Sequence, residues 1–201
     1  MKKLLLLIPI LLFTLTVSAQ NMAVNQSAAS TSNLKTADYK RAVKFNSNVI
    51  EVNKKNIDAY KNRAKAHLEL KNYKEAVTDY NVIIRSEPTN VDAIYNRGIA
   101  KMHLEDFRGA VADLTKVIKL NPDDKNAYLA RASAKMSMFN SKGAIQDFNY
   151  LIKLDSTNMD LYYNRGVAKY EIKDDKGACT DWQKAATTDN RAEKALKKYC
   201  K

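Results

Sequence analysis

One pattern of residues returns every 34 positions along this chain of 201 residues. Four copies cover residues 57–90, 91–124, 125–158 and 159–192, and each has a bulky residue at its fourth position and a small residue four positions later. The bulky residues are Tyr60, Ile94, Tyr128 and Tyr162, and the small ones are Ala64, Gly98, Ala132 and Gly166. Because self-similarity at a fixed period of this size is typical of stacked repeats, the chain is predicted to form a repeat array.

Each unit is predicted to contain two amphipathic helices. Apolar residues recur at spacings of three and four on both sides of a polar break, such as Lys71-Asn72 or Glu105-Asp106. Pro88 and Pro122 lie where one unit ends and the next begins, and proline ends a helix because it lacks the amide donor. A second small residue and a second bulky one follow each break: Ala76, Ala110, Ala144 and Ala178, then Tyr80, Leu114, Phe148 and Trp182.

A 34-residue unit of this kind resembles the tetratricopeptide repeat, and the resemblance extends over residues 38–201. It implies an all-α, right-handed superhelical solenoid of helix-turn-helix repeats. Residues 38–56 match the second half of a repeat, because Tyr39, Ala42 and Val49 lie two periods before Phe107, Ala110 and Val117. Residues 191–201 are predicted to form a capping helix, since a terminal repeat has no following neighbour to cover its apolar face.

The first residues have the features of a secretory signal peptide. Lys2 and Lys3 precede an apolar run at 4–17, and Val17-Ser18-Ala19 has small residues where a signal peptidase cleaves. A retained membrane anchor is the alternative, but the run has 14 residues and a bilayer needs about 20. We therefore predict a signal peptide at 1–19, export to the periplasm or the exterior, no stable membrane anchor, and a flexible leader at 20–37, of which residues 20–34 carry no charge.

Positive charge is concentrated at the two ends of the repeat region. Residues 35–74 have eleven Lys and Arg against four Asp and Glu, and residues 184–201 have six against two. Such ends could bind anionic polymers or a membrane surface, or could simply keep the protein soluble. Nucleic acid is the least favoured partner, because no recognised nucleic-acid motif accompanies the charge and export would separate the chain from it.

An arginine and an aspartate recur at the seventh and twenty-third positions of every unit. In an antiparallel hairpin that turns near the middle of the unit, these positions lie at similar heights, so each arginine is predicted to pair with the aspartate of its own unit. A row of arginines that binds an anion is the alternative. The pairs are Arg63 with Asp79, Arg97 with Asp113, Arg131 with Asp147, and Arg165 with Asp181.

The chain shows no sign of catalysis, and we predict a non-enzymatic protein without cofactor or metal. His67 and His103 occupy non-equivalent repeat positions, with no cysteine or carboxylate at metal-ligand spacing on the same helix face. The sequence also has no glycine-rich phosphate loop and no nucleophile motif.

In tetratricopeptide repeat proteins the first helices of the units line a concave groove that receives a peptide or a helix. The resemblance places the second, fifth, sixth, ninth and twelfth positions of each unit on this groove. We predict partner binding by thirteen residues at these positions: Lys61, Asn62, Lys65, Tyr95, Asn96, Ile99, Met102, Leu129, Met136, Tyr163, Asn164, Val167 and Tyr170. The alternative for some of them is packing against neighbouring repeats.

The predicted groove changes from basic to apolar along the array, which suits a ligand with acidic groups followed by bulky apolar ones. Family members that clamp the C-terminal carboxylate of a chaperone use five polar residues, of which this chain matches only Lys61 and Asn96. The clamp function is therefore not carried over. The expected function is a protein-binding scaffold or adaptor, and the sequence leaves its partner and oligomeric state open.

The two cysteines, Cys179 and Cys200, are predicted to form a disulfide. If the last helices turn around Asp189 and Asn190, both cysteines lie about equally far from that turn, and export favours such bonds. Two free thiols that fill the last interface are the alternative. The sequence from Gly177 to Trp182, followed by Tyr199-Cys200, also resembles the last unit of exported repeat proteins from Bacteroidetes, which implies a Gram-negative periplasm.

Overall fold

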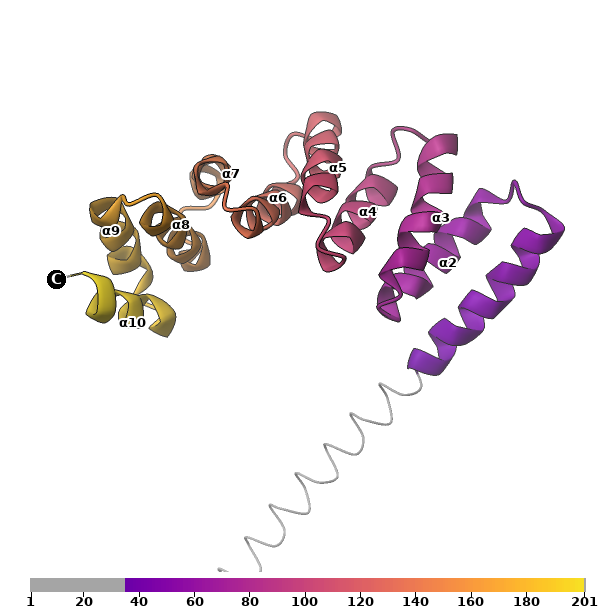
Figure 1. The fold of residues 1–201 in the computed structure, drawn as a ribbon, viewed down its shortest axis with the longest axis horizontal. Helices are drawn as coiled ribbons and strands as arrows, with labels where there is room; N and C mark the ends of the chain where they lie inside the picture. Colours follow the sequence, from indigo (N-terminus) through magenta and orange to yellow (C-terminus); the bar gives the residue numbers. More distant parts are fainter. Residues whose placement is uncertain (1–34, 201) are drawn as a thin grey trace, which may run out of the picture.

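The computed structural model describes residues 35–200, and in this range all regular secondary structure is helical (Figure 1). The predicted signal peptide at 1–19 lies outside the described residues, as do residues 20–34 of the predicted leader. Over residues 35–200, no helix has both the length and the apolar character that crossing a bilayer requires.

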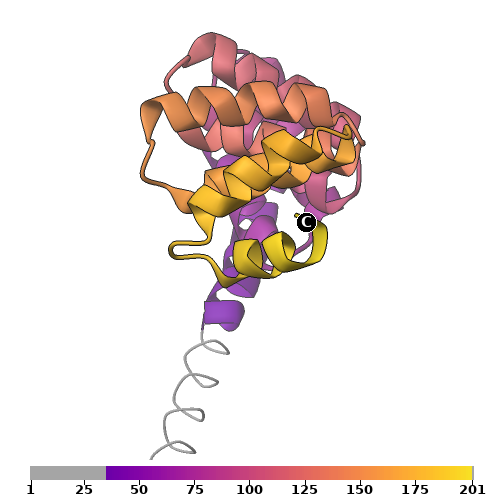
Figure 2. The same ribbon diagram turned by 90° about the vertical axis from the view of Figure 1, so that its left-hand side faces the viewer.

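Each 34-residue unit contains two helices that pack side by side, and successive units stack in chain order (Figures 1 and 2). We call α2, α4, α6 and α8 the first helices and α3, α5, α7 and α9 the second helices. The pairs are α2 (Ile57–Glu69) with α3 (Tyr73–Ser86), α4 (Val91–His103) with α5 (Phe107–Leu120), α6 (Lys125–Ser137) with α7 (Ser141–Leu154), and α8 (Met159–Glu171) with α9 (Asp175–Ala185).

The two ends of the array differ from the predicted boundaries by a few residues. Residues 35–52 form the N-terminal helix, so the last three residues of the predicted leader are helical. The reason is that residues 35–38 contain no glycine or proline, and Asp38 forms an ion pair with Arg41 one turn later. The capping helix α10 (Asn190–Tyr199) begins one residue before the predicted 191, because Asp189 caps it by accepting the backbone N–H of Arg191.

The turn inside each unit is closed by one residue in the left-handed region. These residues lie 34 positions apart, with φ between 57° and 66°, and none is glycine: Lys71, Glu105, Phe139 and Lys173. In each case the next residue donates its backbone N–H to the carbonyl five positions earlier, as Asp106 does to Lys101 over 2.9 Å. This is the Schellman ending of a helix, and it sends the chain back antiparallel.

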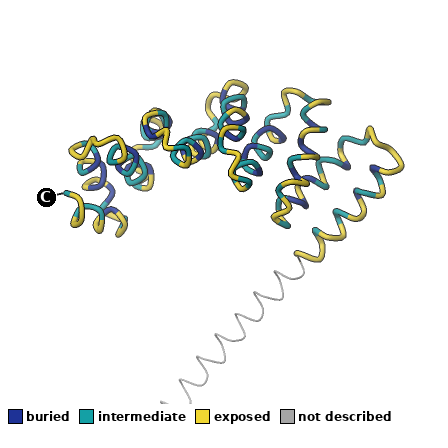
Figure 3. The backbone as a smooth tube through the Cα atoms, viewed as in Figure 1, coloured by how far each residue is buried: buried dark blue, intermediate teal, exposed yellow. Residues whose placement is uncertain are grey.

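Small residues let the two helices of a unit approach, and bulky ones fill the space beside them. The buried positions lie where the helices meet their neighbours (Figure 3). Gly166 shows the dependence most clearly. A Cβ there would lie 2.6 Å from Nε1 of Trp182, whereas at Gly98 the nearest atom would be Cγ of Leu114 at 3.3 Å. Since Trp182 is the largest residue at its repeat position, the unit that contains it has room only for glycine opposite.

The predicted arginine–aspartate pairs are confirmed in all four units. Arg131, for example, donates from Nε and Nη2 to the two carboxylate oxygens of Asp147, at 3.0 and 2.6 Å. Its Nη1 donates to Thr115 in the preceding unit, and Arg63, Arg97 and Arg165 make equivalent bonds to Ser47, Asn81 and Asn149. Each guanidinium therefore joins the helices of its own unit and also links two units, which leaves no row of free arginines for an anion.

A lysine completes this arrangement in units two to four but not in unit one. Lys101, Lys135 and Lys169 each place Nζ within 2.8 Å of the aspartate in their own unit. His67 holds the equivalent position in unit one and is buried beside Asn72. Burial lowers the pKa of His67 below its ordinary 6.5, although Asp79 acts in the opposite direction. The ring is therefore kept neutral in the folded protein.

His67 is expected to make the fold less stable in mild acid. Because its pKa is lower in the folded chain, the unfolded chain takes up the proton first, and stability falls as the pH drops below 6.5. Melting temperatures of wild type, His67→Gln and the exposed-histidine control His103→Gln should be measured from pH 7.5 to 5.5. Wild type and the control should lose stability relative to His67→Gln, and parallel curves for all three would contradict the prediction.

Candidate functional site

The groove predicted on the first helices contains a pocket at its N-terminal end. The pocket lies between α2 and α4 and has a volume of about 450 Å³. Lys61, Lys65 and Leu68 line it from α2, and Asp92 and Asn96 from α4. Tyr80 and Ile83 of α3 also line it and are themselves almost fully buried. An acidic group and an adjoining apolar side chain could both be accommodated here.

The two pocket lysines differ in charge environment. Nζ of Lys61 lies 2.8 Å from a carboxylate oxygen of Glu87, which also accepts a hydrogen bond from Asn90. These contacts raise the pKa of Lys61 and lower the pKa of Glu87. Lys65 is exposed and has no ion pair within the described part of the chain. Lys65 is therefore the pocket cation most available to a ligand.

Polar groups that suit a peptide backbone lie next to this cation. The amide side chain of Asn96 is half-buried in the pocket wall, whereas that of Asn62 is exposed on α2. Burial raises the pKa of Tyr80 to about 12, so its phenol keeps its proton at neutral pH. Asparagine amides can donate to and accept from a peptide backbone.

Beyond the pocket, the predicted groove residues of units two and three are partly exposed and mostly apolar. Tyr95 and Met102 pack against the core formed by Ile94, Leu114 and Val117, and each keeps part of its surface open. Ile99 is half-buried, Leu129 is 41% exposed, and Met136 packs at the edge of the next core cluster. These side chains can therefore contact a ligand, while the core on which they pack is complete without one.

The groove prediction has to be revised for unit four, because α10 lies against those residues. The guanidinium of Arg191 stands 4.5 Å from the ring centre of Tyr163 and also forms an ion pair with Asp160. Tyr170 packs on Tyr199 with ring centres 4.6 Å apart. Tyr163, Val167 and Tyr170 all belong to the same apolar cluster as Leu196 and Cys200 of the C-terminal end. Asn164 is half-buried on the same helix.

Some residues of the site were not identified from the sequence. The repeat equivalents of Glu87 are Asn121, Asp155 and Asp189, but its partner Lys61 does not recur, so the repeat pattern did not point to the pair. The lysines at 101, 135 and 169 recur every 34 residues and could have been found by extending the arginine–aspartate alignment. The contact of Arg191 with Tyr163 depends on how α10 folds back, which no repeat register specifies.

Neither histidine shows metal-site geometry. His103 stacks on Tyr73 with ring centres 4.3 Å apart, and His67 is enclosed in unit one. Among residues 35–200, no three histidine, cysteine, aspartate or glutamate side chains are grouped so that they could hold a metal ion.

Comparison with known proteins identifies the repeat. A sequence family described as tetratricopeptide repeat matches residues 65–135. A comparison with curated proteins found no match.

Several solved structures share the fold. The structure of YrrB, described as a TPR protein with an unusual peptide-binding site, is 23% identical with a TM-score of 0.73, over 83% of this chain and 88% of that one. A structure of MamA is 20% identical with a TM-score of 0.70, over 81% and 93%. A tetratricopeptide repeat protein from Parabacteroides merdae is 26% identical with a TM-score of 0.60, over 78% and 63%.

Proposed function

This chain is a tetratricopeptide repeat protein, and on that premise we propose that it is a non-enzymatic scaffold that holds a peptide of another protein in the groove of its first three units. The observation that carries the proposal is the pocket between α2 and α4, which is lined by exposed Lys65, the amide of Asn96 and the apolar side chain of Leu68.

The order of side chains along the groove defines the peptide that fits. An acidic residue would lie at Lys65, because Lys61 already has a carboxylate partner in Glu87. A bulky apolar residue further along would contact Tyr95 and Met102, which are partly exposed and firmly supported by the core below them. Supported aromatic and methionine side chains of this kind supply much of the binding energy at protein interfaces.

A displayed library of random peptides, selected on residues 20–201, tests this proposal. Selected peptides are expected to combine an acidic residue with a bulky apolar one. The best peptide should bind Lys65→Glu and Tyr95→Ala roughly tenfold more weakly than wild type, because each change removes one anchor. Lys153→Glu, an exposed lysine at the end of α7, serves as the charge-matched control and should bind normally.

Salt separates groove binding from the alternative, a binder of anionic polymers or membrane surface that uses the basic ends. Groove binding should survive moderate salt since apolar contacts contribute to it, whereas polyanion binding should be lost as salt rises. Equal binding to Lys65→Glu and Lys153→Glu would refute the groove proposal.

We also propose that the protein works outside the cytoplasm, in the periplasm of a Gram-negative cell or beyond it. The support is the signal-peptide pattern of residues 1–19. Fractionation of cells that produce the full chain, with N-terminal sequencing of the product, tests this: a chain retained in the cytoplasm with Met1 intact would refute it.

A further inference from the structure

The N-terminal helix, residues 35–52, has the sequence of a second helix, but no first helix among residues 35–200 covers it. Its Ala42 and Val49 correspond to Ala76 and Ile83 of α3, which are fully buried. Ala42 and Val49 are only half-buried. On the same face, Phe45 is 68% exposed and Val52 is 90% exposed. We call this face, formed by Ala42, Phe45, Val49 and Val52, the open face.

The chain does not make the turn that would bring a first helix onto the open face. In unit one, residues 70–72 form the turn between α2 and α3. One period earlier, residues 36–38 occupy the equivalent positions and are helical. Within the described residues, the open face therefore lacks the hairpin that covers the second helix of each complete unit.

Phe45 replaces the aspartate that every complete unit has at this position. Asp79, Asp113, Asp147 and Asp181 are buried against an arginine of their own first helix. At Phe45 an apolar side chain stands in that place, so a helix that covers it needs an apolar residue where the other first helices have arginine. The open face thus specifies a different helix from those within the array.

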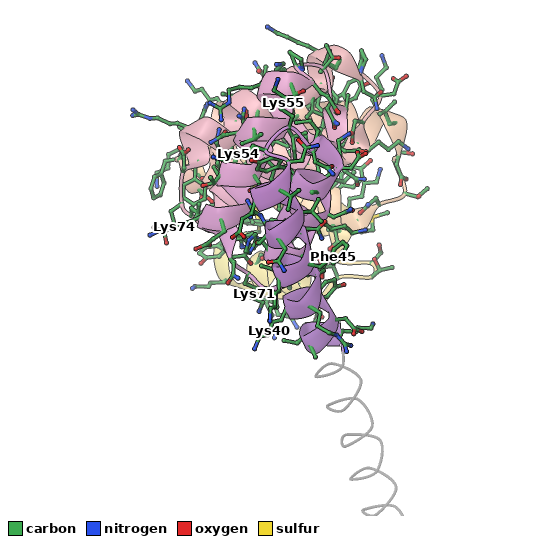
Figure 4. All side chains as sticks on the ribbon, turned by 90° about the vertical axis from the view of Figure 1, so that its right-hand side faces the viewer. Lys40, Phe45, Lys54, Lys55, Lys71 and Lys74 are labelled. Atoms are coloured by element: carbon green, nitrogen blue, oxygen red, sulfur yellow. A yellow bond between two sulfur atoms is a disulfide. The ribbon has the colours of Figure 1, made fainter. Side chains whose placement is uncertain are left out.

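Exposed lysines lie along one side of the open face and at its C-terminal end. Six of them have no ion pair within residues 35–200. Lys44 lies next to Phe45 in the N-terminal helix, and Figure 4 labels the other five: Lys40, Lys54, Lys55, Lys71 and Lys74. A helix seated among them would gain from carboxylates along its margins. Residues 20–34 carry no charged side chain, so the chain itself offers no such complement on its N-terminal side.

Two other occupants fit less well. A second copy stacked end to end would bring this basic end against the C-terminal end, where residues 184–201 have six basic and two acidic residues. A bilayer would meet only two bulky exposed apolar side chains, Phe45 and Val52, beside the carboxylate of Glu51. A helix fits better, because Ala76 and Ile83, the equivalents of Ala42 and Val49 in unit one, are buried in a pair of helices.

We propose that the open face binds an amphipathic helix of another protein, apolar on one side and acidic along its margins, which completes the half unit. The surface is separate from the groove, and the proposal does not depend on groove binding.

The probe is a stapled 13-residue peptide with the sequence of α4, a helix that already fits a second helix of this array. In the peptide, Arg97→Leu and Lys101→Leu provide apolar side chains to contact Phe45. Three further changes in the peptide supply carboxylates along its margins: Asn96→Glu, Met102→Glu and His103→Glu. Its reverse-charge control has lysine at the three glutamate positions and at Asp92. Binding to residues 20–201 is followed by fluorescence anisotropy at low salt.

The acidic peptide should bind with micromolar affinity, and Phe45→Ala should weaken binding roughly tenfold because the central apolar contact is lost. The lysine peptide should also bind at least about tenfold more weakly than the acidic one. Phe139→Ala is the matched control, since Phe139 is 88% exposed but lies in the turn between α6 and α7. It should leave binding unchanged.

Four results would overturn the proposal. The first is no saturable binding, or equal binding to wild type and Phe45→Ala. The second is that the peptide does not bind, whereas phosphatidylglycerol vesicles bind the wild-type protein but not Phe45→Ala. This result would assign the face to a bilayer. The third is a dimer in sedimentation that Phe45→Ala dissociates. The fourth is peptide binding only after residues 20–34 are deleted, which would assign the face to the chain itself.

Discussion

Replacement of Asp147 by alanine is expected to lower the free energy of unfolding by about 3 kcal/mol. Its carboxylate is 3% exposed and accepts hydrogen bonds from Nε and Nη2 of Arg131 and from Nζ of Lys135. Without it, two cations whose side chains are 15% and 13% exposed face each other with no counter-charge. Loss of one partner of a buried pair costs roughly 3–5 kcal/mol, and the lower figure applies because both cations keep some contact with water.

Chemical denaturation of the purified chain measures this effect, and two further variants test its cause. Asp123→Ala removes an exposed carboxylate from the loop before α6 and should change stability by no more than about 0.5 kcal/mol. The triple change Arg131→Leu, Lys135→Leu and Asp147→Leu removes all three charges and should recover much of the loss. If Asp147→Ala were as stable as Asp123→Ala, the pair would not hold the unit together.

The sequence was sufficient to predict the repeat fold because each unit repeats the same physical requirements. Small residues recur where helices approach, and the arginine and aspartate recur sixteen positions apart, so one hairpin geometry explains all four pairs. Boundaries were less well predicted at the ends, where no second copy exists for comparison. The helical start at residue 35 depends on the local absence of a helix breaker, and α10 depends on a cap at Asp189.

The groove was predictable in outline, but its chemistry was not. Repeat position placed Lys61, Lys65 and Asn96 together, and the structure brings them to one pocket. Repeat position could not show that Glu87 neutralises Lys61, because Tyr95, Leu129 and Tyr163 hold the position of Lys61 in the other units and the pair occurs in unit one alone. It also could not show that Arg191 contacts Tyr163 and that Tyr199 contacts Tyr170, since α10 leaves the 34-residue register.

Departures from the repeat pattern are the most informative positions in this chain. His67 takes the place of a lysine and introduces a neutral buried ring in unit one. Phe45 takes the place of a buried aspartate and leaves an apolar side chain exposed. Both lie in the N-terminal part of the array, His67 on α2 and Phe45 on the helix before it. The N-terminal half of the array is therefore where we expect partner recognition to be concentrated.

Loss of the disulfide between Cys179 and Cys200 is expected to cost about 3 kcal/mol, the value that the chain-entropy model gives for a closed loop of this length. The structure joins these cysteines, which are separated by 21 positions in the sequence and have Cα atoms 5.8 Å apart. The bond attaches the end of α10 to α9, and α10 itself has a single buried residue, Ala192. A helix of ten residues with so little burial is marginal without such a link.

The double change Cys179→Ala and Cys200→Ala should therefore release α10 before the rest of the array unfolds. Hydrogen exchange should show lost protection at residues 190–199 and unchanged protection in α6 and α7, because repeat arrays lose their end elements locally. A reducing agent should destabilise the wild type but leave the double variant unaffected. Material purified from its native compartment, denatured without reduction, should show no reactive thiol. Two reactive thiols in that material, or full protection of α10 in the double variant, would contradict the prediction. Either result would show that packing alone holds α10 against Tyr163 and Tyr170.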